Sequence, residues 1–225
     1  MNWTWDRFVN GDDPRIFHFT HVDNLPSLVE AGELMADCVV RKGERSVVEV
    51  GNQDIKASRR GRRVPVEPGG VVGEYVPFYY APRSPMLFQV AHSYHIQGQQ
   101  IQDQLVYLVS RVSTVAGRCR VVATDRNAAL LLAEFAEGPE GVAKMIDWPL
   151  MRQVMWNSTE ERPDRKERRM AELLVHRGVP VDCITGLVTR TQDTADVVRD
   201  HVAGTCLAEL RLLTCPDWYF DERGW

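Results

Sequence analysis

The chain of 225 residues has few cysteines and lacks a long apolar run. Its five cysteines are an odd number and never have C-x-x-C spacing, so the sequence predicts buried free thiols rather than a disulfide framework or a cysteine zinc site. No stretch approaches the roughly 20 apolar residues of a transmembrane helix. Residues 1–7 also lack the apolar core of a secretion signal. We therefore expect a cytoplasmic protein.

Common nucleotide-binding and hydrolase signatures are also missing. No G-x-G-x-x-G follows an expected strand, no G-x-x-x-x-G-K-[ST] occurs, and there is no serine nucleophile elbow. Two H-x-x-H spacings exist, His18/His21 and His92/His95, but neither has the glutamate and third ligand of a zinc protease. We predict no metal site, and keep a zinc hydrolase only as an alternative that elemental analysis would test.

Alternation and helical periodicity predict a mixture of strands and helices. Asp23 is the expected N-cap of a helix over residues 24–31, which Gly32 ends. Prolines within and after the strand at 76–80 restrict it to a sheet edge or a short piece. Residues 41–73 have little apolar periodicity and predict a long loop with one helical turn. The other expected strands are 16–20, 105–110, 120–124, 171–176, 183–190 and 207–213, and the other helices are 85–94, 125 or 127 to 137, 147–156 and 194–202.

These elements do not follow the regular rhythm of a doubly wound sheet. The expected fold class is α+β around a mainly antiparallel central sheet with long functional loops. We expect one domain over residues 1–225, with its core at about 16–219.

The charged residues are distributed unevenly along the chain. A net charge of −4 does not by itself indicate a nucleic-acid binder, and a run of charges is usually a solvated face. Two basic clusters in an acidic chain nevertheless indicate a local site for a polyanion. The first cluster comprises Lys56, Arg59, Arg60, Arg62 and Arg63, and the second comprises Arg162, Arg165, Lys166, Arg168 and Arg169.

Three features suggest a polar binding cleft. Glu172 stands at the head of an apolar run, where a carboxylate is either a solvated cap or a group that faces a cleft and is paired there. On the first expected strand His18 and Thr20 point to the same side and can hydrogen-bond an amide or a ribose. The aromatic segment 75–87 can stack on a nicotinamide or a base. For the histidine and the aromatic segment, ordinary core packing is the alternative.

Four sequence blocks in a fixed order carry a more specific resemblance, which covers roughly residues 16–190. Together they resemble a DarT-type DNA ADP-ribosyltransferase, the toxin of a DarT–DarG toxin–antitoxin pair. The blocks are His18-Phe19-Thr20-His21 with Asn24-Leu25, an arginine-rich stretch leading to Val64-Pro65 and Gly69-Gly70, Val76-Pro77-Phe78-Tyr79-Tyr80 with Pro82-Arg83-Ser84-Pro85-Met86-Leu87, and Arg169-x-x-Glu172-x-Leu174-Val175.

The resemblance implies a compact ADP-ribosyltransferase fold whose central cleft takes NAD as a co-substrate. Glu172 matches the catalytic glutamate, and Arg59 matches the catalytic arginine of the long loop, with Arg60 as the alternative register. The implied cofactor-binding residues are His18, Phe19, Thr20, Ser27, Met35 and Tyr79. The substrate-binding residues that we expect, on or beside an acceptor loop from about 126 to 169, are Arg83, Trp156, Arg165, Arg169 and Met170.

The implied reaction breaks the bond between ribose and nicotinamide through a transition state that resembles an oxocarbenium ion, which a carboxylate stabilises. The implied acceptor is thymidine in single-stranded DNA, and the implied partner is a DarG-like antitoxin with a macrodomain. Arg59 would assist proton removal from the base or, because arginine stays protonated, polarise the base or position a phosphate. Many relatives carry glutamine where Met170 stands, so guanosine or a protein acceptor remains the alternative.

Overall fold

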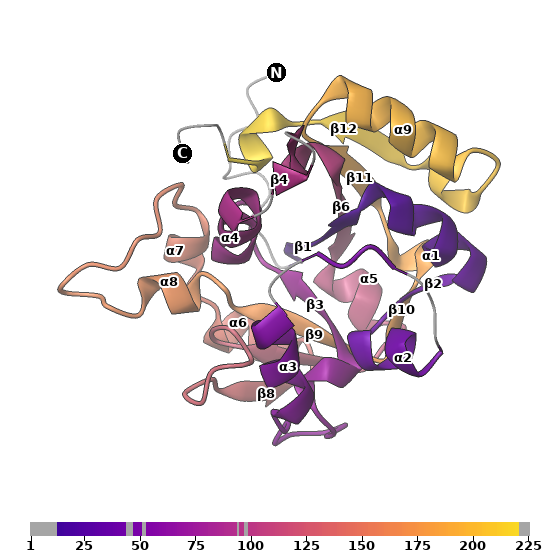
Figure 1. Cartoon of the computed structure of the whole chain (residues 1–225). Coiled ribbons are helices and arrows are strands. Elements are labelled where there is room, and N and C mark those ends of the chain that lie inside the picture. The colour runs from indigo at the N-terminus through magenta and orange to yellow at the C-terminus, as the bar shows by residue number, and fades with distance from the viewer. Residues whose placement is uncertain (1–12, 44–46, 51–52, 94, 97–98, 221–225) are drawn as a thin grey trace.

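The computed structural model describes residues 13–43, 47–50, 53–93, 95–96 and 99–220 (Figure 1). An eight-stranded sheet runs through them in the order β12-β11-β6-β1-β3-β9-β7-β8. Its neighbours are antiparallel except β11 and β12, so the expected α+β class with a mainly antiparallel sheet is confirmed. Its strands are β1 (Arg15–His21), β3 (Tyr75–Tyr79), β6 (Leu105–Arg111), β7 (Val121–Thr124), β8 (Phe135–Glu137), β9 (Glu172–His176), β11 (Gly186–Thr189) and β12 (Arg211–Thr214).

Short helices surround this sheet, and two small ladders lie outside it. Helix α9 packs against β6, β11 and β12 and also against α1, whereas α6 packs against β7 and β8. No helix within the described ranges is both long and apolar enough to cross a membrane. The helices are α1 (Leu25–Ala31), α2 (Asp37–Lys42), α3 (Gln53–Gly61), α4 (Pro85–Ser93), α5 (Val112–Ala116), α6 (Glu140–Met145), α7 (Trp148–Met151), α8 (Arg165–Arg168) and α9 (Gln192–Val202), and the ladders pair β2 (Glu33–Met35) with β10 (Gly178–Pro180) and β4 (His95–Ile96) with β5 (Gln99–Gln100).

The core lies along the central strands. Strand β6 is buried from its first residue to Ser110, which fits its nearly continuous apolar sequence. Phe17 of β1 packs edge-on against Tyr107 and Trp218, with ring centroids 6.3 and 5.2 Å apart. All five cysteines are free thiols, as expected, but only Cys183 and Cys215 are buried. Cys38 and Cys119 are half-buried and Cys206 is exposed.

Strand β3 lies between β1 and β9 and has five residues, so the expected short piece is confirmed and the alternative of a sheet edge is wrong. It pairs with β9 along its whole length but with β1 only at Phe17 and Tyr79. Pro77 has no N–H to offer β1, and its carbonyl instead accepts a hydrogen bond from His18 Nδ1 at 2.8 Å. The two strands therefore separate where proline removes a ladder donor, and a cavity opens beside them.

The helix expected between 125 or 127 and 137 does not form. Residues 125–134 are irregular and lead into the short strand β8. Asp125 Oδ1 accepts a hydrogen bond from the Glu134 N–H at 2.9 Å, and Asn127 Oδ1 accepts one from the Ala129 N–H at 2.9 Å. These side chains thus satisfy backbone donors in turns, which competes with helix formation.

The stretch expected to be a long loop at 41–73 contains more helix than predicted. It includes the end of α2 and the nine residues of α3, whose sequence has one large apolar residue, Ile55, and so carries no visible helical stripe. The N-cap of α1 is Asn24 rather than Asp23, although Gly32 ends that helix in the left-handed conformation as expected.

Several other boundaries were also wrong. Helix α7 has its N-cap at Asp147 but ends at Met151, five residues early. Strand β11 is shorter than the expected 183–190, and the last strand, β12, starts at Arg211 because residues Cys206–Glu209 form a 3₁₀ turn. The expected helix end at Tyr94 lies outside the described residues.

Candidate functional site

A cavity of about 230 Å³ opens between β1, β3 and the helices α1, α2 and α3. The structure brings together around it all the residues that the sequence predicted for the cofactor, and it adds Arg59 of α3. The cofactor residues that line it are His18, Phe19, Thr20, Ser27, Met35 and Tyr79.

His18 is a neutral hydrogen-bonding group at the wall of this cavity. Burial lowers the pKa of His18 to about 4, and the nearby cations Lys56 and Arg59 add to that effect. Because Nδ1 bonds the Pro77 carbonyl, Nδ1 carries the proton and Nε2 is an acceptor. The histidine can therefore accept a hydrogen bond without adding charge.

The other predicted cofactor residues form an aromatic pair and two hydroxyls. The rings of Phe19 and Tyr79 are stacked, with centroids 6.4 Å apart. Burial and the nearby carboxylate of Glu172 raise the pKa of Tyr79, so its phenol stays neutral. The Thr20 hydroxyl accepts a hydrogen bond from Asn24 Nδ2 at 3.0 Å, and the Ser27 hydroxyl donates to the backbone carbonyl of the same Asn24 at 3.1 Å.

Glu172 is a buried carboxylate held in a fixed position at the start of β9. Its side chain has 0% exposure, and it accepts hydrogen bonds from Arg59 Nη1 at 2.8 Å (Oε1) and 3.0 Å (Oε2). The backbone N–H of Ala128 donates to the same Oε2 at 3.1 Å. The Glu172 N–H donates to the Thr124 hydroxyl, also at 3.1 Å, which holds the start of β9 against β7. The solvated-cap interpretation of Glu172 is therefore wrong.

The two arginines that the sequence left as alternatives have different partners. Arg59 lines the cavity and pairs with Glu172, which is buried and is not itself a lining residue. Arg59 Nη2 is buried without a hydrogen-bond partner among the described residues. Arg60 Nε instead donates to Asp37 Oδ2 of α2 at 2.8 Å. The geometry thus places Arg59, rather than Arg60, beside the carboxylate.

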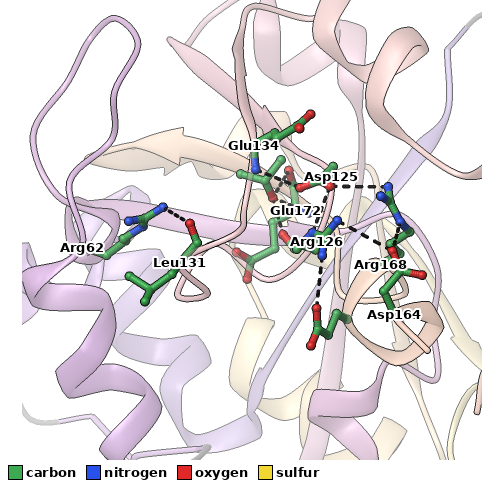
Figure 2. A network of polar contacts seen from close by, with 10 residues as sticks. Arg62, Asp125, Arg126, Leu131, Glu134, Asp164, Arg168 and Glu172 are labelled. Atoms are coloured by element: carbon green, nitrogen blue, oxygen red, sulfur yellow. Dashed lines mark hydrogen bonds and ion pairs between the residues drawn. The ribbon is translucent and has the colours of Figure 1, made fainter. Parts of the chain in front are cut away.

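A polar network joins the loop at 125–134 to α8 (Figure 2). The Asp125 carboxylate accepts from Arg126 Nε at 3.0 Å and lies 3.4 Å from Arg168 Nη1. Arg168 Nε also donates to Asp164 Oδ2 at 2.6 Å, and Arg126 Nη1 donates to Glu167 Oε2 at 3.2 Å. This network fixes the loop that presents the Ala128 N–H to Glu172, and it neutralises part of the second basic cluster.

Two of the residues predicted to contact DNA are instead buried in the interior. Trp156 is 2% exposed and its Nε1 donates to the Arg83 carbonyl at 3.0 Å. Arg169 is 1% exposed and its guanidinium donates to four backbone carbonyls. In this structure both side chains bind backbone carbonyls of the protein itself. The carbonyls bound by Arg169 belong to Leu150, Met151, Gln153 and Pro82, at 2.8, 2.8, 2.9 and 3.0 Å.

The other three residues predicted to bind the substrate, Arg83, Arg165 and Met170, contact other parts of the protein. The Arg83 guanidinium lies 4.8 Å from the centre of the Phe220 ring, and Arg83 does not line the cavity. Arg165 donates to the Gln153 side chain at 2.5 Å. Met170 is half-buried, and its sulfur accepts a hydrogen bond from Asn127 Nδ2 at 3.7 Å.

Comparison with known proteins identifies the family. The family model described as ssDNA thymidine ADP-ribosyltransferase, DarT, matches residues 17–220. This chain belongs to the DarT family. It is 33% identical over 198 residues to a DNA ADP-ribosyl transferase of Mycobacterium tuberculosis (strain ATCC 25618 / H37Rv), with 84% of this chain and 83% of that protein covered. It is also 33% identical over 208 residues to one of Thermus sp. (strain 2.9), with 91% and 95% covered.

Solved DarT structures share this fold. Thermus sp. 2.9 DarT in complex with ADP-ribosylated ssDNA matches with a TM-score of 0.81 at 29% identity, covering 92% of this chain and 96% of that one. The same protein in complex with NAD+ matches with a TM-score of 0.76 at 30% identity, covering 92% and 97%. A relative in Thermosipho africanus (strain H17ap60334) is a DNA ADP-ribosyl transferase–DNA ADP-ribosyl glycohydrolase fusion protein, 26% identical over 114 residues, which are 51% of this chain and 27% of the fusion.

Sequence reasoning missed several residues of this DarT-family site. The bonds that hold Glu172 come from a backbone N–H, at Ala128, and from a strand threonine, Thr124, and neither leaves a recognisable signal in a single sequence. Asn24 lies inside the first sequence block, but its side chain bonds the backbone of Val48, 24 residues later, which the sequence does not reveal.

Proposed function

We propose that this chain transfers ADP-ribose from NAD to a base of single-stranded DNA with release of nicotinamide, and that this base is thymidine. One observation carries the proposal. Arg59 lines the same cavity as His18 and is paired there with the fully buried carboxylate of Glu172. Membership of the DarT family and the NAD+ and ADP-ribosylated ssDNA complexes of Thermus sp. DarT support the same reaction.

The residues present suit a nicotinamide ribose. Neutral His18 and the hydroxyls of Thr20 and Ser27 offer hydrogen-bonding groups without charge, which fits an amide and a sugar. The stacked Phe19 and Tyr79 provide an aromatic surface that fits a nicotinamide ring. When bound, NAD supplies an activated C1′–N bond whose leaving group departs as neutral nicotinamide.

Glu172 is our proposed catalytic carboxylate. As the C1′–N bond breaks, positive charge develops on the ribose, and a fixed negative group nearby stabilises that charge. Glu172 is already held by Arg59 and by the Ala128 N–H, so it need not reorganise during the reaction.

Arg59 is our proposed acceptor-side residue. The attacking ring nitrogen of thymine carries a proton that it must lose as the new C1′–N bond forms, and Glu172 is our candidate to take it. Since arginine stays protonated, Arg59 does not act as the base. Its unpartnered Nη2 instead can donate a hydrogen bond to a carbonyl oxygen of the acceptor, which withdraws electrons from the neighbouring N–H.

Mass spectrometry of short oligonucleotides tests the proposal. Single-stranded DNA with one thymidine should gain one ADP-ribose in the presence of NAD and wild-type protein, whereas the same strand without thymidine should not. The matched control is Glu172→Ala, which should give no product. If only guanosine is modified, the assignment of thymidine as the acceptor base is wrong. If a protein but no DNA is modified, the assignment of DNA as the acceptor is wrong.

We further propose that the protein acts as a toxin on DNA in the cytoplasm and that a DarG-like antitoxin with a macrodomain opposes it. The Thermosipho africanus fusion of a transferase with a glycohydrolase supports this pairing of activities. Toxicity on expression that is relieved by Glu172→Ala, and also by co-expression of the antitoxin, is the expected outcome.

A further inference from the structure

Asn24 makes hydrogen bonds that its place in the fold does not require. It occupies the N-cap position of α1, where asparagine is favoured because its side chain can accept a bond from the first turn, yet it makes no such bond. Its amide instead pairs with the backbone of Val48. The Val48 N–H donates to Oδ1 at 2.7 Å, and Nδ2 donates to the Val48 carbonyl at 3.0 Å.

The segment that Asn24 holds forms part of the cavity wall. We define residues 47–50 as the strap, and all four of its residues line the cavity. Glu49 of the strap also forms an ion pair with Lys56 of α3. Asn24 Nδ2 additionally donates to the Thr20 hydroxyl, so one amide joins the strap to the cofactor side of β1.

We propose that Asn24 is a positioning residue that holds the strap over the cleft and thereby sets the affinity for NAD. This inference rests on the proposed function. Ordering backbone costs conformational entropy, and a segment that is already held in place removes that cost from the binding step. Without the Asn24 side chain the Val48 backbone loses these two hydrogen bonds, and NAD must order the strap on binding.

Kinetics of ADP-ribosyl transfer to a thymidine oligonucleotide test the inference. For Asn24→Ala we expect the KM for NAD to rise about tenfold, as the loss of two or three modest hydrogen bonds implies. Asn24 also lines the cavity, but none of its hydrogen bonds involves Glu172 or Arg59, so the kcat at saturating NAD should stay within about twofold. Asn24→Asp keeps an acceptor for the Val48 N–H but cannot donate to the Val48 carbonyl. The KM of this variant for NAD should therefore lie between those of wild type and Asn24→Ala.

Hydrogen exchange provides a readout that does not depend on enzymatic turnover. The Val48 amide should exchange faster in Asn24→Ala than in wild type, and saturating NAD should restore part of its protection. If the variant were destabilised as a whole, amides outside the strap would exchange faster as well.

The matched control is Thr205→Ala, which also removes two side-chain-to-backbone bonds, to the Val202 carbonyl at 2.7 Å and from the Leu207 N–H at 3.2 Å. Thr205 does not line the cavity, so its KM for NAD should match wild type. An unchanged KM in Asn24→Ala, or a fall in kcat alone, would overturn the inference. If wild-type protein modifies no DNA and binds no NAD, the proposed function fails instead, and the exchange experiment still reports on the strap.

Discussion

Replacement of Arg59 by alanine should separate catalysis from cofactor binding. Arg59 is 11% exposed and its Nη1 lies 2.8 Å from the fully buried carboxylate of Glu172. Removal of one preorganised donor from an enzyme site typically costs about 100- to 1000-fold in rate, or about 2.7–4 kcal/mol. We therefore expect kcat for transfer to DNA to fall by about that factor. The NAD dissociation constant, measured by calorimetry, should change less than about tenfold, because His18 and Thr20 remain.

Arg60→Ala is the matched control, since it removes the same side chain one residue later. The Arg60–Asp37 pair is partly exposed, at 26% and 24%, and such pairs contribute at most about 1 kcal/mol. Its kcat should stay within about threefold of wild type. Thermal unfolding would be followed for both variants, because loss of Arg59 leaves Glu172 buried with one donor fewer and should cost up to about 3 kcal/mol. A larger loss of kcat in Arg60→Ala than in Arg59→Ala would refute the assignment.

Three further variants probe other parts of the site. Glu172→Gln loses the charge and leaves a single amide oxygen for the donors of Arg59 and Ala128, so transfer should fall at least about 100-fold and the unfolding free energy by up to about 3 kcal/mol; more than a tenth of wild-type activity would contradict this. His18 has a lowered folded pKa of about 4, so below about pH 6.5 the unfolded state takes up the proton first and stability falls. Denaturant titrations at pH 8 and pH 5 should show about 2 kcal/mol of this loss in wild type and not in His18→Asn. Arg169→Met leaves four carbonyls without their donor and should cost about 3 kcal/mol or more in unfolding free energy; loss of DNA binding at unchanged stability would instead favour a DNA contact.

Much of the cavity lining could be predicted from sequence because three of its residues are neighbours in the chain. His18, Phe19 and Thr20 follow one another on β1, where alternation and the surrounding motif are visible, and all three line the cavity. Glu172 could also be located, because a carboxylate at the head of a buried strand needs a partner. Its partner could be named only by resemblance, since Arg59 is 113 residues earlier in the chain.

The acceptor side was predicted less well because its residues have no periodic signal. Arg169 and Trp156 look like surface groups in a basic, polar stretch, but both are drawn inside by backbone carbonyls that a sequence does not reveal. A guanidinium has five donors and can be buried without a carboxylate when carbonyls satisfy them. Burial lowers the pKa of Arg169 to about 9, which leaves it charged at neutral pH.

Helix α3 connects the two sides of the site. Lys56 and Arg59 are one turn apart and therefore lie on the same face of the helix. Lys56 pairs with Glu49 of the strap, whereas Arg59 pairs with Glu172 of β9. The first pair is partly exposed and weak, while the second is buried, so the position of α3 is set mainly at the carboxylate. A shift of α3 changes both contacts at once, and the position of the strap is therefore coupled to that of Arg59.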